Sequence, residues 1–241
     1  MPIKNIIFDL GGVIIDIDYR RTAEAFRQLG AFNFDVVYTQ SKQDHLFDDY
    51  DIGKINSNSF RQTLQKKLGI EVKNEVFDSA WNAMLLDLPK KRLDFIKSLR
   101  GQYKVFLFSN TNDIHFKEVF NICKRQNGFN TFDGYFDKEY YSNIFGKRKP
   151  NPDAFISILN ENKIEAEETI FFDDSLQHVL GARQAGLYAM HLSKGKSIVD
   201  IVEFIDEINC AKKLKDEENY SDLRDKSCCE CTMKVGKIIL N

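Results

Sequence analysis

Short apolar segments that each end in polar residues constrain the fold of this chain most. Residues Ile3–Leu10 form a largely apolar, β-branched run that Gly11-Gly12 stops, and similar runs follow at Lys104–Phe108, Thr169–Phe172 and Tyr188–Leu192. Near-continuous apolar runs of this length are typical of strands buried on both faces of a parallel sheet. The sequence therefore predicts four such strands, each with a polar end.

Helical patterns separate these runs. The periodicity of Asp113–Lys124 predicts a helix, Asn151-Pro152 is an N-cap followed by proline at the first helical position, and Leu176–Ala185 ends at Gly186. Strands that alternate with helices are typical of βαβ units. We therefore expect an α/β fold with a doubly wound, Rossmann-like parallel sheet, in which ligands bind outside the carboxyl ends of the strands.

Residues 19–86 interrupt the alternation, because they contain amphipathic segments and no convincing strand. These segments are Thr22–Leu29, Phe34–Phe47 and Ser59–Leu68. We expect a small all-helical cap inserted after the first strand, where it would overhang the site and exclude water. The α/β core would comprise residues 1–18 and 87–208, and residues 209–241 would form a charged, cysteine-containing tail.

Composition excludes several functional classes. The chain has 241 residues, a formal net charge of -2 and a sequence pI near 6.1, so no global basic field favours nucleic acid or anionic membranes as partners. No run of about 18 apolar residues and no signal peptide is evident, which predicts a cytoplasmic protein. Five cysteines match no disulfide framework, and Cys228, Cys229 and Cys231 lack a second group at zinc spacing, so we expect reduced thiols.

Three carboxylates follow predicted strands. Asp9 lies at the end of the first strand, where the glycines after it let the backbone approach a ligand, so it is a candidate nucleophile. A strand-end aspartate before glycine is also a common turn former. Asp173 and Asp174 are adjacent after an apolar strand, where they would repel each other unless a cation such as Mg²⁺ lies between them.

Three further polar residues are candidates for binding phosphate. Ser109 and Asn110 can offer a hydroxyl and an amide, although this segment also resembles an ordinary loop and helix cap. Lys149 precedes a helix and could neutralise both a phosphoryl group and the nucleophile, whereas most basic loops are merely solvated. Phe47-Tyr50 and Tyr140-Tyr141 could line a substrate pocket, although aromatic residues mostly pack in cores.

Together these residues resemble the four motifs of the haloacid dehalogenase-like hydrolase superfamily. The resemblance spans about Ile3 to Ile208. It is carried by Phe8-Asp9-Leu10-Gly11-Gly12-Val13-Ile14, Ser109, Lys149-Pro150-Asn151-Pro152-Asp153-Ala154-Phe155, Phe172-Asp173-Asp174, Gly181-Ala182 and Ala185-Gly186. Within the superfamily the chain is most similar to helical-cap phosphatases, including the bacterial α-glucose-1-phosphate phosphatase branch.

The resemblance implies a two-step phosphoryl transfer. Asp9 would attack phosphorus to form an aspartyl-phosphate that water hydrolyses, with Lys149 balancing charge. Ser109 and the backbone of Asn110 would bind phosphate. The implied ligands of Mg²⁺ are Asp9, the carbonyl oxygen of Gly11, Asp174, and Asp173 either directly or through water.

One departure from the family pattern concerns proton transfer. Most phosphatases of the superfamily carry an aspartate two positions after the nucleophile, where this chain has Gly11. A general acid is typically worth about 10²–10⁴-fold in rate. Candidate substitutes are Asp16, Asp18 and His45, each of which could equally be a turn, surface or capping residue. Alternatively, the chain favours good leaving groups, relies on ordered water, or binds without turnover.

Two further details stay open at this point. Relatives commonly have an asparagine where this chain has His178, which could simply replace a loop hydrogen bond, and His191 is expected to be an ordinary strand residue. Residues 48–53 look superficially like a calcium loop, but their oxygen spacing fits neither register, so a turn between helices is expected.

The leading functional hypothesis is a Mg²⁺-dependent phosphatase for a small phosphorylated metabolite, a sugar phosphate, acting as a monomer or weak dimer. A phosphomutase would need the general acid that Gly11 cannot supply, and a 2-haloacid dehalogenase would not need Asp173 and Asp174 for a metal. A catalytically silent phosphoryl-ligand binder is the alternative from a different class.

Overall fold

The computed structural model describes residues 2–38, 45–193, 198–201, 204–206 and 208–209. Five strands within these residues form one parallel sheet in the order β3-β2-β1-β4-β5. The strands are β1 (Asn5–Phe8), β2 (Lys104–Ser109), β3 (Lys138–Tyr141), β4 (Thr169–Asp173) and β5 (Tyr188–His191). The predicted α/β fold with a doubly wound parallel sheet is therefore confirmed, and β3 is an additional strand that the apolar pattern does not predict.

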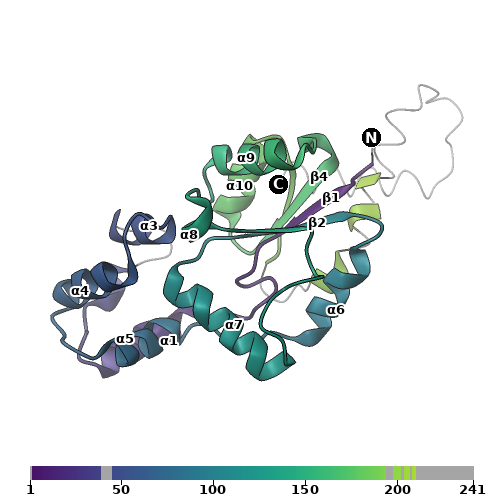
Figure 1. The fold of residues 1–241 in the computed structure, drawn as a ribbon. Coiled ribbons are helices and arrows are strands. Elements are labelled where there is room, and N and C mark those ends of the chain that lie inside the picture. Colours follow the sequence, from purple (N-terminus) through teal and green to yellow (C-terminus); the bar gives the residue numbers. More distant parts are fainter. Residues whose placement is uncertain (1, 39–44, 194–197, 202–203, 207, 210–241) are drawn as a thin grey trace, which may run out of the picture.

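Helices cover both faces of this sheet (Figure 1). Ile6 and Phe8 of β1 face the cluster formed with α6 (Lys90–Leu99) and α7 (Asp113–Asn127), while Ile7 faces the opposite cluster. The second cluster contains residues of α9 (Pro152–Asn162) and α10 (Leu176–Gln184). Burial on both faces explains why β1 is apolar from Ile6 to Phe8, as parallel strands usually are.

A helical cap stands beside the core (Figure 1). Its helices are α1 (Tyr19–Gln28), α2 (Phe34–Val37), α3 (His45–Asp51), α4 (Ser57–Leu68) and α5 (Asn74–Asn82). The cap has its own aromatic core, in which Phe26, Phe60 and Trp81 are buried. Within the amphipathic segment Phe34–Phe47, α2 ends at Val37 and α3 begins at His45, and residues 39–44 lie outside the described residues.

Two extended segments connect the cap to the core. Hydrogen bonds run from Asp18 N to the carbonyl oxygen of Met84, from Asp16 N to that of Asp87, and from Leu86 N to that of Asp16. The chain thus leaves the core and returns to it along neighbouring paths. We propose residues 19–86 as the cap on this basis.

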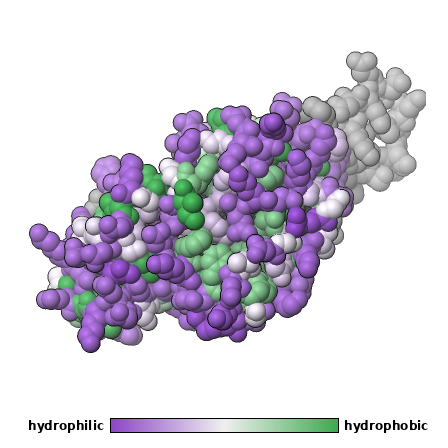
Figure 2. All heavy atoms as spheres, in the orientation of Figure 1, coloured by the Kyte–Doolittle hydropathy of each residue, from purple (hydrophilic) through white to green (hydrophobic). Residues whose placement is uncertain are grey.

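The small helix α8 (Ser142–Phe145) and the loop after it connect β3 to α9 at the carboxyl edge of the sheet. Asn151 caps α9 by accepting from Asp153 N, with Pro152 at the first helical position as the sequence predicts. On the face in Figure 2, hydrophilic side chains predominate and apolar ones form scattered groups. None of the helices in the described ranges is long and apolar enough to cross a membrane.

Residues 210–241, which include Cys210 and the three clustered cysteines of the tail, lie outside the described residues. Cys123 is a buried free thiol in the α6–α7 side of the core. The predicted zinc-free, reduced tail therefore stays a prediction.

Candidate active site

Three predicted site residues come together because their strands are neighbours in the sheet. Phe8 of β1 is level with Phe172 of β4, so Asp9 and Asp173 follow at the same height. The main chain joins them, since Asp9 N donates to the carbonyl oxygen of Phe172 at 2.9 Å. Ser109 ends β2 on the other side of β1. The site thus lies outside the carboxyl ends of adjacent parallel strands, where such sheets bind ligands.

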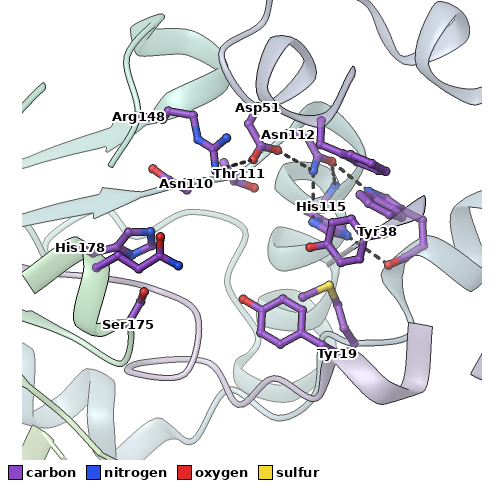
Figure 3. Close-up of a pocket in the computed structure, with 14 residues that line it drawn as sticks. Tyr19, Tyr38, Asp51, Asn110, Thr111, Asn112, His115, Arg148, Ser175 and His178 are labelled. Atoms are coloured by element: carbon purple, nitrogen blue, oxygen red, sulfur yellow. Dashed lines mark hydrogen bonds and ion pairs between the residues drawn. The ribbon is translucent and has the colours of Figure 1, made fainter. Parts of the chain in front are cut away.

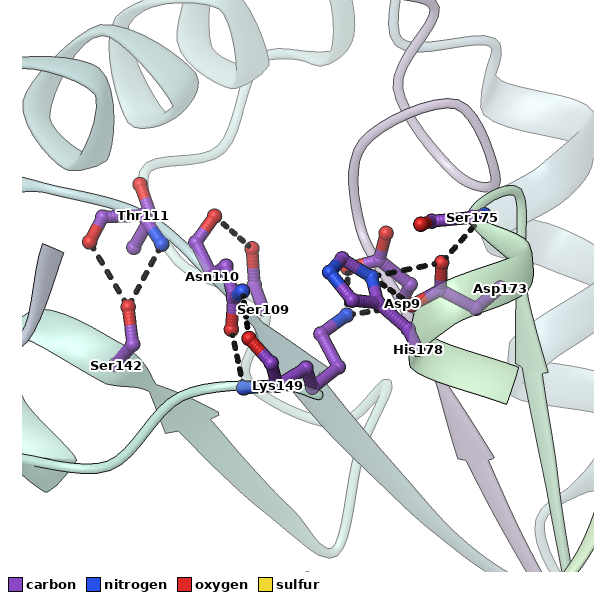
Figure 4. Close-up of polar contacts among 9 residues, drawn as sticks. All are labelled: Asp9, Ser109, Asn110, Thr111, Ser142, Lys149, Asp173, Ser175 and His178. Atoms are coloured by element: carbon purple, nitrogen blue, oxygen red, sulfur yellow. Dashed lines mark hydrogen bonds and ion pairs between the residues drawn. The ribbon is translucent and has the colours of Figure 1, made fainter. Parts of the chain in front are cut away.

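Lys149 is fully buried and lies between two of these carboxylates (Figure 4). Its Nζ is 2.7 Å from Oδ1 of Asp9 and 2.7 Å from Oδ2 of Asp173. Burial lowers the pKa of Lys149, but the charges of Asp173 and Asp9 outweigh burial and raise the pKa above its ordinary value. Lys149 is therefore a permanent positive charge at the base of the site.

Asn110 holds the main chain of Lys149 in place. Its Nδ2 donates to the carbonyl oxygen of Lys149 at 2.9 Å, and the N–H of Lys149 donates to Asn110 Oδ1 at 2.9 Å. One N–H of this side chain is thereby engaged. The side-chain amide, which the sequence suggested could face phosphate, instead positions the backbone of the lysine.

Asp173 is fully buried and has several donors around it. Oδ1 accepts from Ser175 N at 2.7 Å, Oδ2 pairs with Lys149, and Nδ1 of His178 lies 3.0 Å from both oxygens. Burial raises the pKa of Asp173, but Lys149 and His178 outweigh it, so the pKa falls below its ordinary value. His178 therefore forms the kind of local hydrogen bond anticipated for it.

For Asp9 and Asp174, nearby positive charges and hydrogen-bond donors do not outweigh the effect of burial on the pKa. Burial is the main cause that raises the pKa of Asp9 to about 6, although Lys149 opposes it. Burial, followed by the charges of Asp9 and Asp173, raises the pKa of Asp174 to about 7. This pattern indicates an excess of negative charge around Asp174.

The three carboxylates fit a divalent cation. Asp9, Asp173 and Asp174 each offer an oxygen, and these oxygens lie within 4.8 Å of one another. Gly12 makes this packing possible, because a Cβ at that position would lie 2.2 Å from Oδ2 of Asp174. Carboxylate oxygens are the ligands that Mg²⁺ prefers in proteins. Since both oxygens of Asp173 already have donors, its geometry favours contact with an ion through water.

A cavity of about 100 Å³ opens beside these residues at the junction of the cap and the core (Figure 3). The core contributes polar residues from the strand ends, while the cap contributes aromatic residues. The lining residues are Tyr19, Tyr38, Phe47, Asp51, Trp81, Met84, Asn110, Thr111, Asn112, His115, Arg148, Ser175, Gln177 and His178. Phe47 thus lines the cavity as the sequence suggested.

Polar contacts dock the cap onto the core beside the cavity. Arg148 forms ion pairs with Asp48 and Asp51 of α3, and Asp51 also accepts a hydrogen bond from Asn112. The close packing extends to Gly53, because a Cβ there would lie 2.3 Å from the carbonyl oxygen of Asn143 in the core. The segment taken from sequence as a turn is therefore the end of α3 followed by a turn at residues 52–53.

Other residues predicted near the site lie elsewhere. Asp18 caps α1 and binds Arg20, Asp16 pairs with Arg92 at 2.8 Å, and His45 is an exposed residue at the start of α3. None of the three is among the described residues that line the cavity. Their contacts and exposure correspond to the capping and surface roles that were the alternatives to proton transfer.

The aromatic residues that were considered for the pocket, other than Phe47, are buried elsewhere. Tyr140 and Tyr141 pack in the two core clusters, one on each face of the sheet, which is the core packing that the sequence favoured over a place in the pocket. Tyr50 is buried in the cap, where its hydroxyl accepts from Ile114 N. His191 ends β5, and its Nε2 lies 2.9 Å from the carbonyl oxygen of Asp174.

Sequence reasoning missed the cavity residues Asp51, Asn112, His115 and Arg148. Asn112 and Arg148 were visible as neighbours of predicted site residues, and Asn112 also caps α7 by accepting from His115 N. Asp51 and His115 had no local signal, because only the docking of the cap brings them to the site.

Comparison with known proteins agrees with this geometry. Residues 3–186 match the family model of haloacid dehalogenase-like hydrolases. The chain is 31% identical to D-ribitol-5-phosphate phosphatase of Bacteroides thetaiotaomicron, over 80% of this chain and 93% of that protein. It is 24% identical to a sesquiterpene phosphatase of Aspergillus oryzae, over 86% of this chain and 97% of that protein.

A solved structure is similar over the same region. The HAD family enzyme bt-2542 from Bacteroides thetaiotaomicron, crystallised as the wild-type protein with magnesium and inorganic phosphate, superposes with a TM-score of 0.75 and 32% sequence identity. The match covers 83% of this chain and 99% of that one. With the family model, this likeness confirms the resemblance inferred from the motifs. The chain therefore belongs to the haloacid dehalogenase-like hydrolase family.

Proposed function

We propose that the chain is a Mg²⁺-dependent phosphatase that releases phosphate from a small phosphorylated metabolite, a sugar phosphate, through an aspartyl-phosphate on Asp9. The observation that carries this proposal is the arrangement of buried Asp9, Lys149 and Asp173 with half-buried Asp174 below a cavity between cap and core. The magnesium and phosphate in the crystals of a related enzyme support it.

Asp9 is the nucleophile in this proposal. With its pKa raised only to about 6, the carboxylate is ionised at neutral pH. Its oxygen attacks phosphorus, the P–O bond to the alcohol breaks, and the resulting acyl phosphate is then hydrolysed by water to restore Asp9. Lys149 stays bound to Asp9 Oδ1 and balances the negative charge that both steps concentrate at this point.

The phosphoryl group would be held by core residues. Ser109 offers its hydroxyl, since its contact with the carbonyl oxygen of Asn110 is long at 3.4 Å. The main-chain N–H of Asn110 offers a second donor, while its side chain keeps Lys149 in place. Phosphoryl transfer depends mainly on such positioning and charge neutralisation.

Mg²⁺ would be held by Asp9, Asp174 and the carbonyl oxygen of Gly11, with Asp173 through water. When bound, the ion offsets the repulsion between the carboxylates and the phosphate dianion. The three clustered carboxylates favour this chemistry over that of a 2-haloacid dehalogenase.

Gly11 leaves the usual position of the general acid without a carboxyl group. A Cβ at Gly11 would point to Ile17, 3.3 Å from its Cδ1. We therefore expect p-nitrophenyl phosphate, whose leaving group needs little protonation, to be hydrolysed faster than sugar phosphates.

The test is phosphate release from p-nitrophenyl phosphate and a panel of sugar phosphates, with Mg²⁺ or with EDTA. We expect metal-dependent release that Asp9→Asn reduces to the rate without enzyme. Asp16→Asn makes the same chemical change outside the cavity and should retain wild-type activity. If folded protein binds Mg²⁺ but releases no phosphate from any substrate, the chain is the silent binding protein instead.

A further inference from the structure

One carboxylate in the cavity belongs to the cap and has no part in the chemistry proposed above. Asp51 is the last residue of α3, and its side chain is 14% exposed. Among the described residues that line the cavity it is the single carboxylate. It faces the cavity from the cap side (Figure 3).

Asp51 is held loosely by the core. Asn112 Nδ2 lies 3.4 Å from Oδ1, and Arg148 Nη2 lies 3.5 Å from Oδ2. Strong hydrogen bonds between charged groups are about 2.7–2.9 Å long, and an ionised carboxylate can accept about four hydrogen bonds. Both oxygens of Asp51 therefore keep unused accepting capacity.

The surroundings of Asp51 are narrow and partly aromatic. The cap also lines the cavity with Tyr19, Phe47 and Trp81, and the cavity holds only about 100 Å³. The indole N–H of Trp81 already points to Asn112 Oδ1 at 3.4 Å. A ligand here meets apolar ring faces beside one acceptor-rich group, which suits a carbon chain that carries hydroxyl groups.

We infer that Asp51 accepts hydrogen bonds from hydroxyl groups of the leaving alcohol and thereby makes the enzyme prefer, among monoesters of unactivated alcohols, those that are uncharged and polyhydroxylated. This inference rests on the proposed phosphatase function and identifies the substrate class of that site.

Hydroxyl groups supply the further, shorter hydrogen bonds that this half-buried carboxylate can still accept. An alkyl alcohol would instead displace water from Asp51 and leave it with only its two long contacts to Asn112 and Arg148, which a binding site penalises strongly. Alcohols that carry a carboxylate are also disfavoured, because Asp48 and Asp51 together already exceed the single charge of Arg148. The two named relatives act on leaving groups of opposite polarity, since ribitol carries many hydroxyl groups and a sesquiterpene is a hydrocarbon. The hydrogen-bond acceptor at Asp51 suits a leaving group of the first kind.

The experiment compares kcat/KM for three probes: ribitol 5-phosphate, 1-pentyl phosphate of equal chain length, and phosphoglycolate. Both five-carbon probes release an unactivated alcohol, so the missing general acid affects them equally. The wild-type enzyme should prefer ribitol 5-phosphate to each of the other two by at least 10-fold. Asp51→Ala should reduce the ratio of ribitol to pentyl phosphate by roughly 10- to 100-fold, as expected for lost hydrogen bonds to a charged group.

Two further variants separate hydroxyl recognition from docking of the cap. Asp51→Asn keeps an accepting oxygen and should recover part of the ratio. Asp48→Asn removes the other carboxylate on Arg148 but does not line the cavity, so it should leave the ratio within about 3-fold of wild type. Turnover of p-nitrophenyl phosphate by each variant shows that the catalytic residues are intact.

The outcomes are distinct. An equal loss on all substrates in Asp51→Ala, or the same change of ratio in Asp48→Asn, would mean that Asp51 only docks the cap. A wild-type preference for pentyl phosphate or phosphoglycolate would also overturn the inference, while the phosphatase proposal would stand. Failure of the wild type to hydrolyse even p-nitrophenyl phosphate would overturn the proposed function itself, and the inference with it.

Discussion

Lys149 shows how a single buried charge organises the site. An ammonium group away from water is destabilised unless opposite charges surround it, and here Asp9 and Asp173 both lie 2.7 Å from it. The sequence makes Lys149 a candidate for charge neutralisation from its place before α9, and the family resemblance implies that role. It does not predict that Asn110 fixes the lysine backbone, because that contact joins residues 39 positions apart.

His115 supports a prediction about pH and stability. Burial beside Trp81, on which the ring stacks, lowers its pKa to about 4, although the hydrogen bond that its Nε2 donates to the carbonyl oxygen of Trp81 opposes this shift. In the unfolded chain His115 binds its proton more tightly than in the folded protein. The stability that depends on neutral His115 is therefore fully present above pH 6.5 and is lost as the pH falls towards 4. Between pH 7.5 and pH 5 the loss should be about 2 kcal/mol.

Urea unfolding at these two pH values, for wild type and His115→Gln, measures this contribution. Other groups titrate in both proteins, so the comparison uses the difference between their pH dependences. The wild type should lose about 2 kcal/mol more than the variant. Equal losses would mean that His115 is already protonated in the folded protein near pH 5.

At the scale of elements, α10 sets the position of the loop that carries Lys149. A Cβ at Gly181 would lie 2.0 Å from the carbonyl oxygen of Pro150, so the helix and this loop are in contact through backbone. Neither can shift independently of the other. The sequence shows Gly181 within the family pattern, but its reason is visible only in the packing.

Gly181→Ala should therefore move the loop and Lys149 with it. We expect a loss of about 1–3 kcal/mol in the free energy of unfolding, as for overpacking elsewhere, and at least a 10-fold loss in kcat. Urea unfolding and phosphate release measure the two effects. Leu180→Ala, at a half-exposed position of the same helix, is the control and should change neither appreciably. A fully active, fully stable Gly181→Ala protein would contradict the proposed contact.

Which elements could be predicted depended on their burial. β1 and β4 are buried along their whole length and stand out as apolar runs, whereas β3 begins with exposed Lys138 and half-buried Glu139 at the edge of the sheet. The residues at the strand ends could be predicted to lie together, because the carboxyl ends of neighbouring parallel strands meet at one edge of the sheet. The lining of the cavity could not be predicted, because Asp51 and His115 reach it only through contacts between cap and core.

At the scale of the whole molecule, the distance between cap and core decides whether the cavity exists. Gly53 has a φ of 70° and packs against the carbonyl oxygen of Asn143. Gly69 has the same φ of 70°, but a Cβ added there would meet no atom within 4 Å. Alanine at either position adds about 1–2 kcal/mol of backbone strain. At Gly53 it also forces the cap away from the core.

We therefore expect Gly53→Ala and Gly69→Ala to lose similar stability but to differ in activity. Gly53→Ala should lower kcat/KM for a sugar phosphate at least 10-fold, whereas Gly69→Ala should remain within about 3-fold of wild type. Steady-state kinetics beside thermal unfolding checks both expectations. Equal kinetics in the two variants would show that close docking at residue 53 is not needed for turnover.

The paired connections between core and cap have a consequence for how this architecture can change. Asp16 and Asp18 are hydrogen-bonded to the returning segment at residues 84–87, so the insertion begins and ends at nearly the same point. A segment with adjacent ends can be lengthened, shortened or replaced without disturbing the sheet beneath it. Selectivity can thus diverge between descendants of one ancestral gene while the bond-breaking residues are inherited unchanged.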